Sequence, residues 1–411
     1  MRRLPTIPEI LLIFIAAVPL PADDGFTLDQ AVAIALKNNP GVLSALKEAE
    51  ASLGRRLQLE AIPDPEIVFS DEGLGLGRRR DPGGEKEISF GIQQSLEFPG
   101  KRALRSQVGK YGERIALLEI ERAKLIVGTE VKRAYYKTVL SSKTVSSLEG
   151  TLALLDRFIE IAAARYQAGA VPYLDVLRAR VERARAENEL LEARNELRGD
   201  KTRLNLLMGR RGDDPLELLT GLSFAPPAGD LRAVQEAALR TRPSLKIAEL
   251  KLERAKAGLA LSRKNLLPDF SVGLFSPSLR TNAWGFEVGI TVPLYWWKKQ
   301  KGEAIEAAAE KDIEFVSRDS AERRLLARIE EAYSNVTTSA EQVRIFKEKL
   351  LGEIESELEL SLTSYGLGKT EALDLLDISR TYRITQLEYL QTLYLYLVSA
   401  AELEAAGEDS E

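Results

Sequence analysis

The residues of this chain that could carry chemistry are few in kind. There is no His and no Cys, which removes the commonest general base and metal ligand and all thiol chemistry. A Ser/His/Asp triad is therefore impossible, and no phosphate loop, convergent acid pair or metal-ligand cluster can be found in the sequence. We expect no catalytic residue, no metal site and no cofactor. The carboxylates that stand out are Asp175 and Asp374, because they recur at one spacing.

Both aspartates belong to a stretch that occurs twice. It reads YQAGAVPYLDVL from Tyr166 to Leu177 and YGLGKTEALDLL from Tyr365 to Leu376, with Tyr, Gly, Leu, Asp and Leu at matching places. Each copy lies between two long apolar-periodic runs, and its Gly can supply the αL conformation that ends a helix. The pattern predicts a tight helix-to-helix turn, and its recurrence predicts that the whole chain is a duplication.

The elements that must position these turns recur in the same order. We expect a first repeat over about 23–227, with strands at about 66–72 and 87–98 and helices at about 100–168 and 173–208. We expect a second repeat over about 228–405, with strands at about 269–276 and 284–295 and helices at about 301–364 and 370–405. Residues 406–411 form an acidic tail that we expect to be disordered.

The helical runs are too long for one globular core. The run that ends near Ala168 would span about 100 Å at ~1.5 Å per residue. The next run carries heptads with two apolar seams. One seam contains Val176, Leu190, Leu197 and Leu204, and Arg183 interrupts it. The other contains Ala179, Ala186, Ala193 and Leu207. Such helices need partners on both sides, and the small residues let neighbours approach closely.

The first 22 residues are typical of an export signal. Arg2 and Arg3 are followed by the short apolar core Ile10–Val18, and Ala22 is a plausible last residue before cleavage. The mature chain should then lie outside the cytoplasm. Charged residues make up 29% of the sequence with a net charge of -5, which gives no indication of nucleic-acid binding.

The strands alternate apolar with polar or Gly residues and have aromatic residues near their ends. This pattern favours lipid-facing strands with interfacial girdles, built from Phe90, Phe98, Phe270, Trp284, Phe286, Trp296 and Trp297. The competing interpretation is a small soluble sheet packed on helices. A four-stranded sheet in lipid would have open edges, so the strands would have to close by oligomerisation.

This layout closely resembles the TolC-like outer membrane efflux channels, over essentially the whole mature chain. The Tyr-x-x-Gly turn with Asp six residues after the Gly carries the resemblance best. The segment LEFPGKR, Leu96–Arg102, resembles the strand exit in the branch of the family that serves heavy-metal resistance-nodulation-division pumps. The resemblance implies a mostly α fold with a membrane β-barrel contribution, a homotrimer, and an outer membrane location with a large periplasmic portion. Its implied partners are outer membrane lipid, a periplasmic adaptor and an inner-membrane pump.

The resemblance also implies roles for residues of the two turns. Asp374 and Asp377 would form rings of carboxylates at the aperture, which favour cations. Closed-state links would involve Asp175, Tyr365, Thr370 and Lys369, although related channels have a basic residue where this chain has Thr370. The adaptor-contacting tips would be Ala168, Gly169, Ala170, Leu367 and Gly368.

Two other functions fit the sequence. A type I protein secretion channel would have the same fold and pass proteins. A secreted coiled-coil structural protein would have a small sheet and no pore. We favour the passive exit duct of a tripartite efflux system, opened when the helix turns part.

Overall fold

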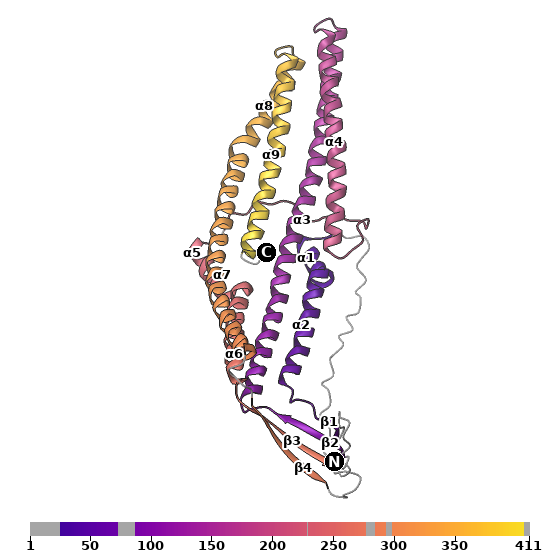
Figure 1. The fold of residues 1–411 in the computed structure, drawn as a ribbon. Helices are drawn as coiled ribbons and strands as arrows, with labels where there is room; N and C mark the ends of the chain where they lie inside the picture. The colour runs from indigo at the N-terminus through magenta and orange to yellow at the C-terminus, as the bar shows by residue number, and fades with distance from the viewer. Residues whose placement is uncertain (1–24, 73–86, 228, 277–283, 293–297, 407–411) are drawn as a thin grey trace.

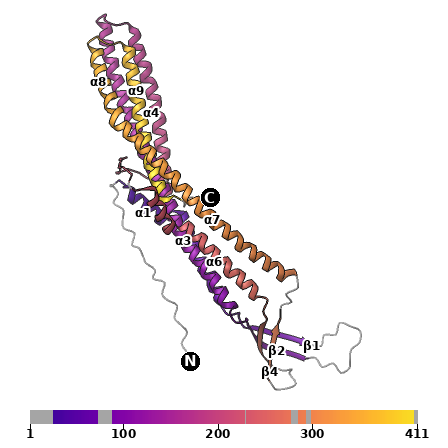
Figure 2. The ribbon, with the colours of Figure 1, turned by 90° about the vertical axis from the view of Figure 1, so that its left-hand side faces the viewer.

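The computed structural model describes residues 25–72, 87–227, 229–276, 284–292 and 298–406. It is a long helical rod with a small sheet at one end and two helix turns at the other (Figures 1 and 2). Over these ranges, no helix combines the length and the hydrophobicity that a membrane span requires. The expected signal peptide, Trp296, Trp297 and the tail beyond Ala406 lie outside the described residues.

The two halves of the chain have the same order of elements, as the repeat predicts. The first half contains α1 (Leu28–Asn38), α2 (Pro40–Glu60), β1 (Glu66–Glu72), β2 (Glu87–Leu96), α3 (Lys101–Gln167) and α4 (Tyr173–Leu207). The second contains α5 (Leu231–Thr241), α6 (Pro243–Lys264), β3 (Asp269–Ser276), β4 (Gly285–Thr291), α7 (Lys298–Ile345), the π-helical η1 (Phe346–Leu350), α8 (Leu351–Gly366) and α9 (Ala372–Ala405).

Local sequence signals explain where the short helices begin. The Thr27 hydroxyl accepts a hydrogen bond from the Gln30 N–H at 3.3 Å, and the Gln30 side chain accepts one from the Thr27 N–H at 2.8 Å. This capping box opens α1. Pro40 and Pro243 occupy the first positions of α2 and α6, where a missing N–H costs nothing.

The second long helix is not continuous, which corrects the helix expected over 301–364. It begins at Lys298, is interrupted by the π segment η1, and ends at Gly366. None of the η1 residues is buried. The last helix begins at Ala372 and not at 370, because Glu371 is extended (φ -79°, ψ 156°).

The strands form one antiparallel sheet in the order β1-β2-β3-β4. In the register, Ile67 faces Ile92, Ile92 faces Leu274, and Leu274 faces Phe286. Since directly paired residues share a face, one face of the sheet is apolar. The opposite face carries Gly and polar residues along with Val68 and Phe275. The Phe275 ring lies over Gly91 and Gly273, where an added Cβ would clash with it.

The aromatic residues expected to face lipid fall into three groups. Phe90, Phe270 and Phe286 lie on the apolar face, and Phe286 keeps 73% of its surface exposed. Trp284, 71% exposed, directly precedes β4 and lies outside it. Phe98 also lies outside the sheet, because β2 ends at Leu96 and not at 98: the Phe98 N–H donates to the Asp269 carboxylate at 2.8 Å.

An ion pair between a buried lysine and a partly exposed aspartate fixes the junction between the sheet and the helices. The Lys101 ammonium, 3% exposed, donates to both Asp269 carboxylate oxygens at 2.8 and 2.9 Å and to the Leu267 carbonyl at 2.9 Å. Gly100 before it has φ 92°, which Gly adopts readily. The start of α3 is therefore fastened to the start of β3.

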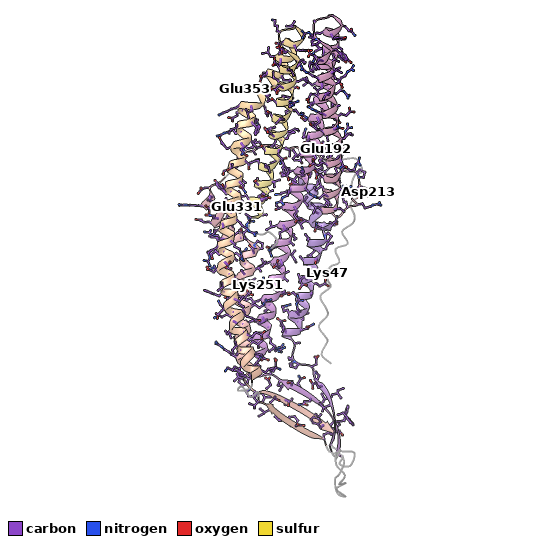
Figure 3. The ribbon with its side chains drawn as sticks, turned by 45° about the horizontal axis from the view of Figure 1, so that its top comes forward. Lys47, Glu192, Asp213, Lys251, Glu331 and Glu353 are labelled. Carbon is purple, nitrogen blue, oxygen red and sulfur yellow. The ribbon has the colours of Figure 1, made fainter. Side chains whose placement is uncertain are left out.

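Near the sheet the helices form an open row in which α2 packs on α3, α3 on α6, and α6 on α7. Toward the turns, the α3–α4 hairpin packs against the hairpin of α8 and α9 (Figure 2). Charged side chains are spaced along the whole rod, from Lys47 on α2 to Glu353 on α8 (Figure 3). The charge-rich composition is thus spread over solvated helix surfaces.

Candidate functional site at the helix turns

The two repeated stretches form the same turn. After α3, the N–H groups of Gly169 and Ala170 donate to the carbonyls of Tyr166 and Arg165, both at 2.9 Å. After α8, the N–H groups of Gly368 and Lys369 donate to Tyr365 and Ser364 at 3.0 and 2.9 Å. Gly169 and Gly368 have φ values of 71° and 76°. These are Schellman motifs, and both need a residue that tolerates positive φ.

The two hairpins share an apolar core just behind the turns. It contains Leu155, Phe158 and Ala162 of α3, Val176, Ala179 and Ala186 of α4, and Leu358, Tyr365, Ala372, Leu375 and Leu376 of the second hairpin. The turns therefore rest on a packed bundle, and their relative position is set by side-chain packing.

Tyr365 is the centre of this core. Its side chain is fully buried and meets Phe158 edge-on, with ring centroids 4.9 Å apart. Its hydroxyl has no hydrogen-bond partner among the described residues. Burial, and secondarily the nearby Asp175 charge, raise the pKa of Tyr365 above its ordinary value. The repeated Tyr166 is instead 46% exposed and contacts Tyr173.

Asp175 lies in the first turn of α4 and is nearly buried, at 8% exposure. The partner that approaches it is Arg178, whose guanidinium lies 3.8 Å from the carboxylate. Asp175 is close enough to Tyr365 to affect its pKa, without a hydrogen bond to the hydroxyl. The structure therefore brings these two expected link residues together.

Thr370 and Lys369 occupy the second turn but are not part of such a contact. Both line a pocket of about 550 Å³ between the turns, together with Asp175 and Arg178. In the described part of the chain, the Lys369 ammonium forms no hydrogen bond or ion pair. Lys369 is exposed, so the structure gives no support for an ionic link through this residue.

Sequence reasoning missed the cation that does connect the turns. Arg165, in the last turn of α3, donates from Nη1 to the Tyr365 carbonyl at 2.6 Å. The same guanidinium lies 4.7 Å from the centroid of the Tyr365 ring. The available signal was a basic residue directly before the repeated Tyr in the first copy, where the second copy has Ser364.

Asp374 and Asp377 are exposed on α9 and line a groove between α4 and α9 of about 610 Å³. Its apolar part is formed by Leu174, Leu177, Val181, Leu373 and Leu376. Three arginines also line it, Arg178, Arg185 and Arg380, and Glu182 pairs with Arg380 and, at 2.9 Å, with Arg185. No grouping of three potential metal ligands occurs within the described ranges.

The tip residues are all open to solvent. Ala168, Gly169, Ala170, Leu367 and Gly368 are exposed, and Leu367 shows 69% of its surface. Leu367 is thus an apolar group that the described residues leave largely uncovered.

Comparison with known proteins identifies the group to which this architecture belongs. Residues 31–210 and 234–407 match the outer membrane efflux protein family, which covers most of both repeats. The chain belongs to this family. Family membership makes the protein an outer membrane efflux component and explains the duplication, since the two matched segments correspond to the two halves of the fold.

Individual relatives agree with this assignment. The chain is 25% identical over 382 residues to the cobalt-zinc-cadmium resistance protein CzcC of Cupriavidus metallidurans, covering 91% of this chain and 88% of the relative. The outer-membrane channel OprN superposes with a TM-score of 0.80 at 17% identity, over 93% of this chain and 90% of OprN. CusC superposes with a TM-score of 0.79 at 17% identity, over 92% and 91%.

These structural matches establish the fold of the efflux channels, a mostly helical duct with a small strand portion. The protein is located in the outer membrane and has a large periplasmic portion. The members of the family and the structural neighbours are transport channels. The turns are thus one end of a channel protein, at the far end of the rod from the sheet (Figure 1).

Proposed function

We propose that three copies of the chain assemble into one passive exit duct, which docks to a periplasmic adaptor and an inner-membrane pump. The observation that carries this proposal is the sheet. Its apolar face is exposed, with Ile67 at 72% and Phe286 at 73%. Within the described residues, β1 and β4 each pair on one side only. Lipid on the apolar face and further copies at the two edges would satisfy both features.

The helices near the sheet support the same assembly. On α2, the side chains of Leu43, Leu46, Leu53 and Leu57 are exposed along one face. On α7, Ile305, Ile313 and Val316 form a second exposed stripe. The two helices are the two ends of the row α2-α3-α6-α7. A stripe at each end suits a head-to-tail contact, which closes into a ring.

This assembly is tested by purification in detergent, followed by mass measurement and planar-bilayer recording. We expect a trimer that conducts ions. Replacement of Leu46 and Leu53 by Asp should shift the mass toward the monomer, while Leu191→Asp, at an exposed position on α4, serves as a control. A wild-type protein that is monomeric and remains in solution without detergent would contradict the proposal and favour the secreted structural protein.

The exposed turns would meet the adaptor. Leu367 and the small residues around both glycines form apolar tips that a helical adaptor could cover. Leu367→Asp should weaken capture of the cognate adaptor without changing trimer mass or conductance. Equal capture by the variant and by wild type would show that Leu367 does not take part in the adaptor contact.

Asp374 and Asp377 would supply the aperture charge. They are exposed side chains on the first two turns of α9. Three copies around one axis would concentrate negative charge and hold cations at the narrow end.

We further propose that the cargo includes divalent metal cations. The support is the similarity to CzcC along nearly the full length of both chains. A host lacking its own channel of this class should regain resistance to cobalt, zinc and cadmium salts when this chain is expressed with its cognate pump and adaptor. Restored tolerance to organic antibacterials, without any change in metal tolerance, would contradict the metal assignment but not the proposed function as an exit duct.

A further inference from the structure

One cation of the first repeat is attached to the backbone of the second repeat's turn. The Arg165 guanidinium donates to the Tyr365 carbonyl at 2.6 Å and lies over the Tyr365 ring at 4.7 Å. That carbonyl also accepts the Gly368 N–H at 3.0 Å, one of the two bonds that close the turn. Arg165 therefore binds the backbone of the turn itself, at the point where α8 ends.

We propose that Arg165 is the cation that holds the two turns together in the closed channel and must leave its position on Tyr365 for the turns to part. The inference rests on the proposed function as a gated duct. Thr370 has no charge with which to form an ionic link, and this contact from the opposite hairpin replaces the link expected through Lys369.

The chemistry of the contact favours this role over a simple helix-end charge. A cation in the last turn of α3 is favourable for the helix dipole wherever its side chain points. Arg165 instead reaches across to the other hairpin, and a planar guanidinium can stack on a ring and donate in its plane at the same time. Gly368 leaves room for it, since a Cβ there would lie 3.2 Å from Arg165 Nη2.

The position of the contact also sets it apart from the other links between the hairpins. Arg380 pairs with Glu182 and Arg383 pairs with Glu189, both between α9 and α4 and farther from the turns. These ion pairs join the ends of long side chains, which can follow a small displacement. The Arg165 contact ends on a main-chain carbonyl, so separation of the turns must break it.

The expected effect is a shift in the balance between closed and open channels. A hydrogen bond from a charged donor is worth about 1.5–3 kcal/mol, and about 1.4 kcal/mol corresponds to a tenfold change in an equilibrium. Loss of one such link should therefore raise the open fraction at least about tenfold, and loss of all three links in a trimer should raise it further. Because the turns also share the Tyr365 core, the assembled trimer should persist.

The test compares Arg165→Ala, Arg165→Lys and the control Arg157→Ala in planar bilayers, with trimer mass and melting temperature measured on the same samples. Arg157 is an exposed arginine earlier on α3, so its removal changes the charge without removing the link. We expect Arg165→Ala to open far more often than wild type, Arg165→Lys to lie in between, and Arg157→Ala to match wild type.

The outcomes separate this inference from the proposed function. If wild-type protein does not conduct at all, the duct itself is wrong. If wild type conducts and a trimeric Arg165→Ala opens no more often, the link is wrong and the duct stands. If Arg165→Ala does not assemble, Arg165→Lys decides: an opening frequency equal to wild type in that variant contradicts a link that needs the planar guanidinium.

Discussion

The two long hairpins have the same repeat origin but differ in how firmly they are built. In the first, α3 runs without interruption for 67 residues and its middle is packed through Leu148 against Leu190 and Ala193 of α4. In the second, α7 gives way to the π segment η1, where no side chain is buried. A π segment contains one extra residue within a helix and often occurs at functional sites. The comparison indicates that the first hairpin is the more rigid one and that the second is able to bend.

The largest effect should come from deleting one residue at matching places in the two hairpins. Removing Lys349 from η1 takes out the extra residue and lets α7 and α8 join as one α-helix with the downstream faces unchanged. Removing Gly150 from α3 rotates every later residue of that helix by about 100°, which exposes the Phe158 face. We expect the Lys349 deletion to fold and form trimers, and the Gly150 deletion to lose about 4 kcal/mol or more.

Melting curves and trimer mass measured on both deletions provide the test. Equal damage from the two deletions would show that the π segment is not an insertion and that the hairpins are equally rigid. In the folded Lys349 variant, channel opening should also become rarer, because the straight helix resists bending.

The repeated tyrosines provide the next comparison. Tyr365 is fully buried in the shared core, whereas Tyr166 is 46% exposed. We expect Tyr365→Ala to cost about 3–5 kcal/mol of unfolding free energy and Tyr166→Ala about 1 kcal/mol. Tyr365→Phe should be nearly neutral, since the hydroxyl has no hydrogen-bond partner within the described residues. Denaturant unfolding of the three variants measures these values, and a large loss in Tyr365→Phe would reveal a hydroxyl contact in the assembled trimer.

The repeated aspartates should differ in function more than in stability. Asp175 is nearly buried, while Asp374 and Asp377 are exposed. Replacement of Asp374 and Asp377 together by Asn should weaken block by multivalent cations severalfold, with the melting temperature unchanged, because screening limits what exposed charges add to stability. Asp175→Asn should leave the block unchanged. Conductance with increasing multivalent cation measures both, and an unchanged block in the double variant would place the aperture elsewhere.

The sequence predicted most of the fold because apolar periodicity is a local signal that repeats. The αL glycines, the capping box at Thr27 and the small residues Ala179, Ala186 and Ala193 of α4 are all found in the expected roles, and these three alanines are buried. Arg183, which interrupts the heptad seam, pairs with Asp156 of α3. Each of these features is decided within one helix or between two neighbouring helices.

The features that could not be predicted from the sequence depend on contacts between the repeats. Arg165 could not be assigned to Tyr365 before the two turns were placed side by side. The π segment has no buried residue that a core pattern could reveal, and Phe98 lies outside the ladder, where its N–H donates to Asp269 of the other half. The roles of Asp374, Asp377 and Lys369 stay predictions, since they depend on how three copies meet.

The smallest effect concerns pH, and it separates α9 from α4. In the second hairpin, burial raises the pKa of Tyr365, Tyr382, Tyr389, Tyr394 and Tyr396 above the ordinary value near 10. A raised folded-state pKa contributes stability below the unfolded value of about 10 and loses it as pH rises through the folded pKa. These tyrosines should therefore leave stability and gating unchanged between about pH 6 and 9. Above about pH 10, α9 should lose hydrogen-exchange protection before α4, and simultaneous loss in both helices would contradict this difference between α9 and α4.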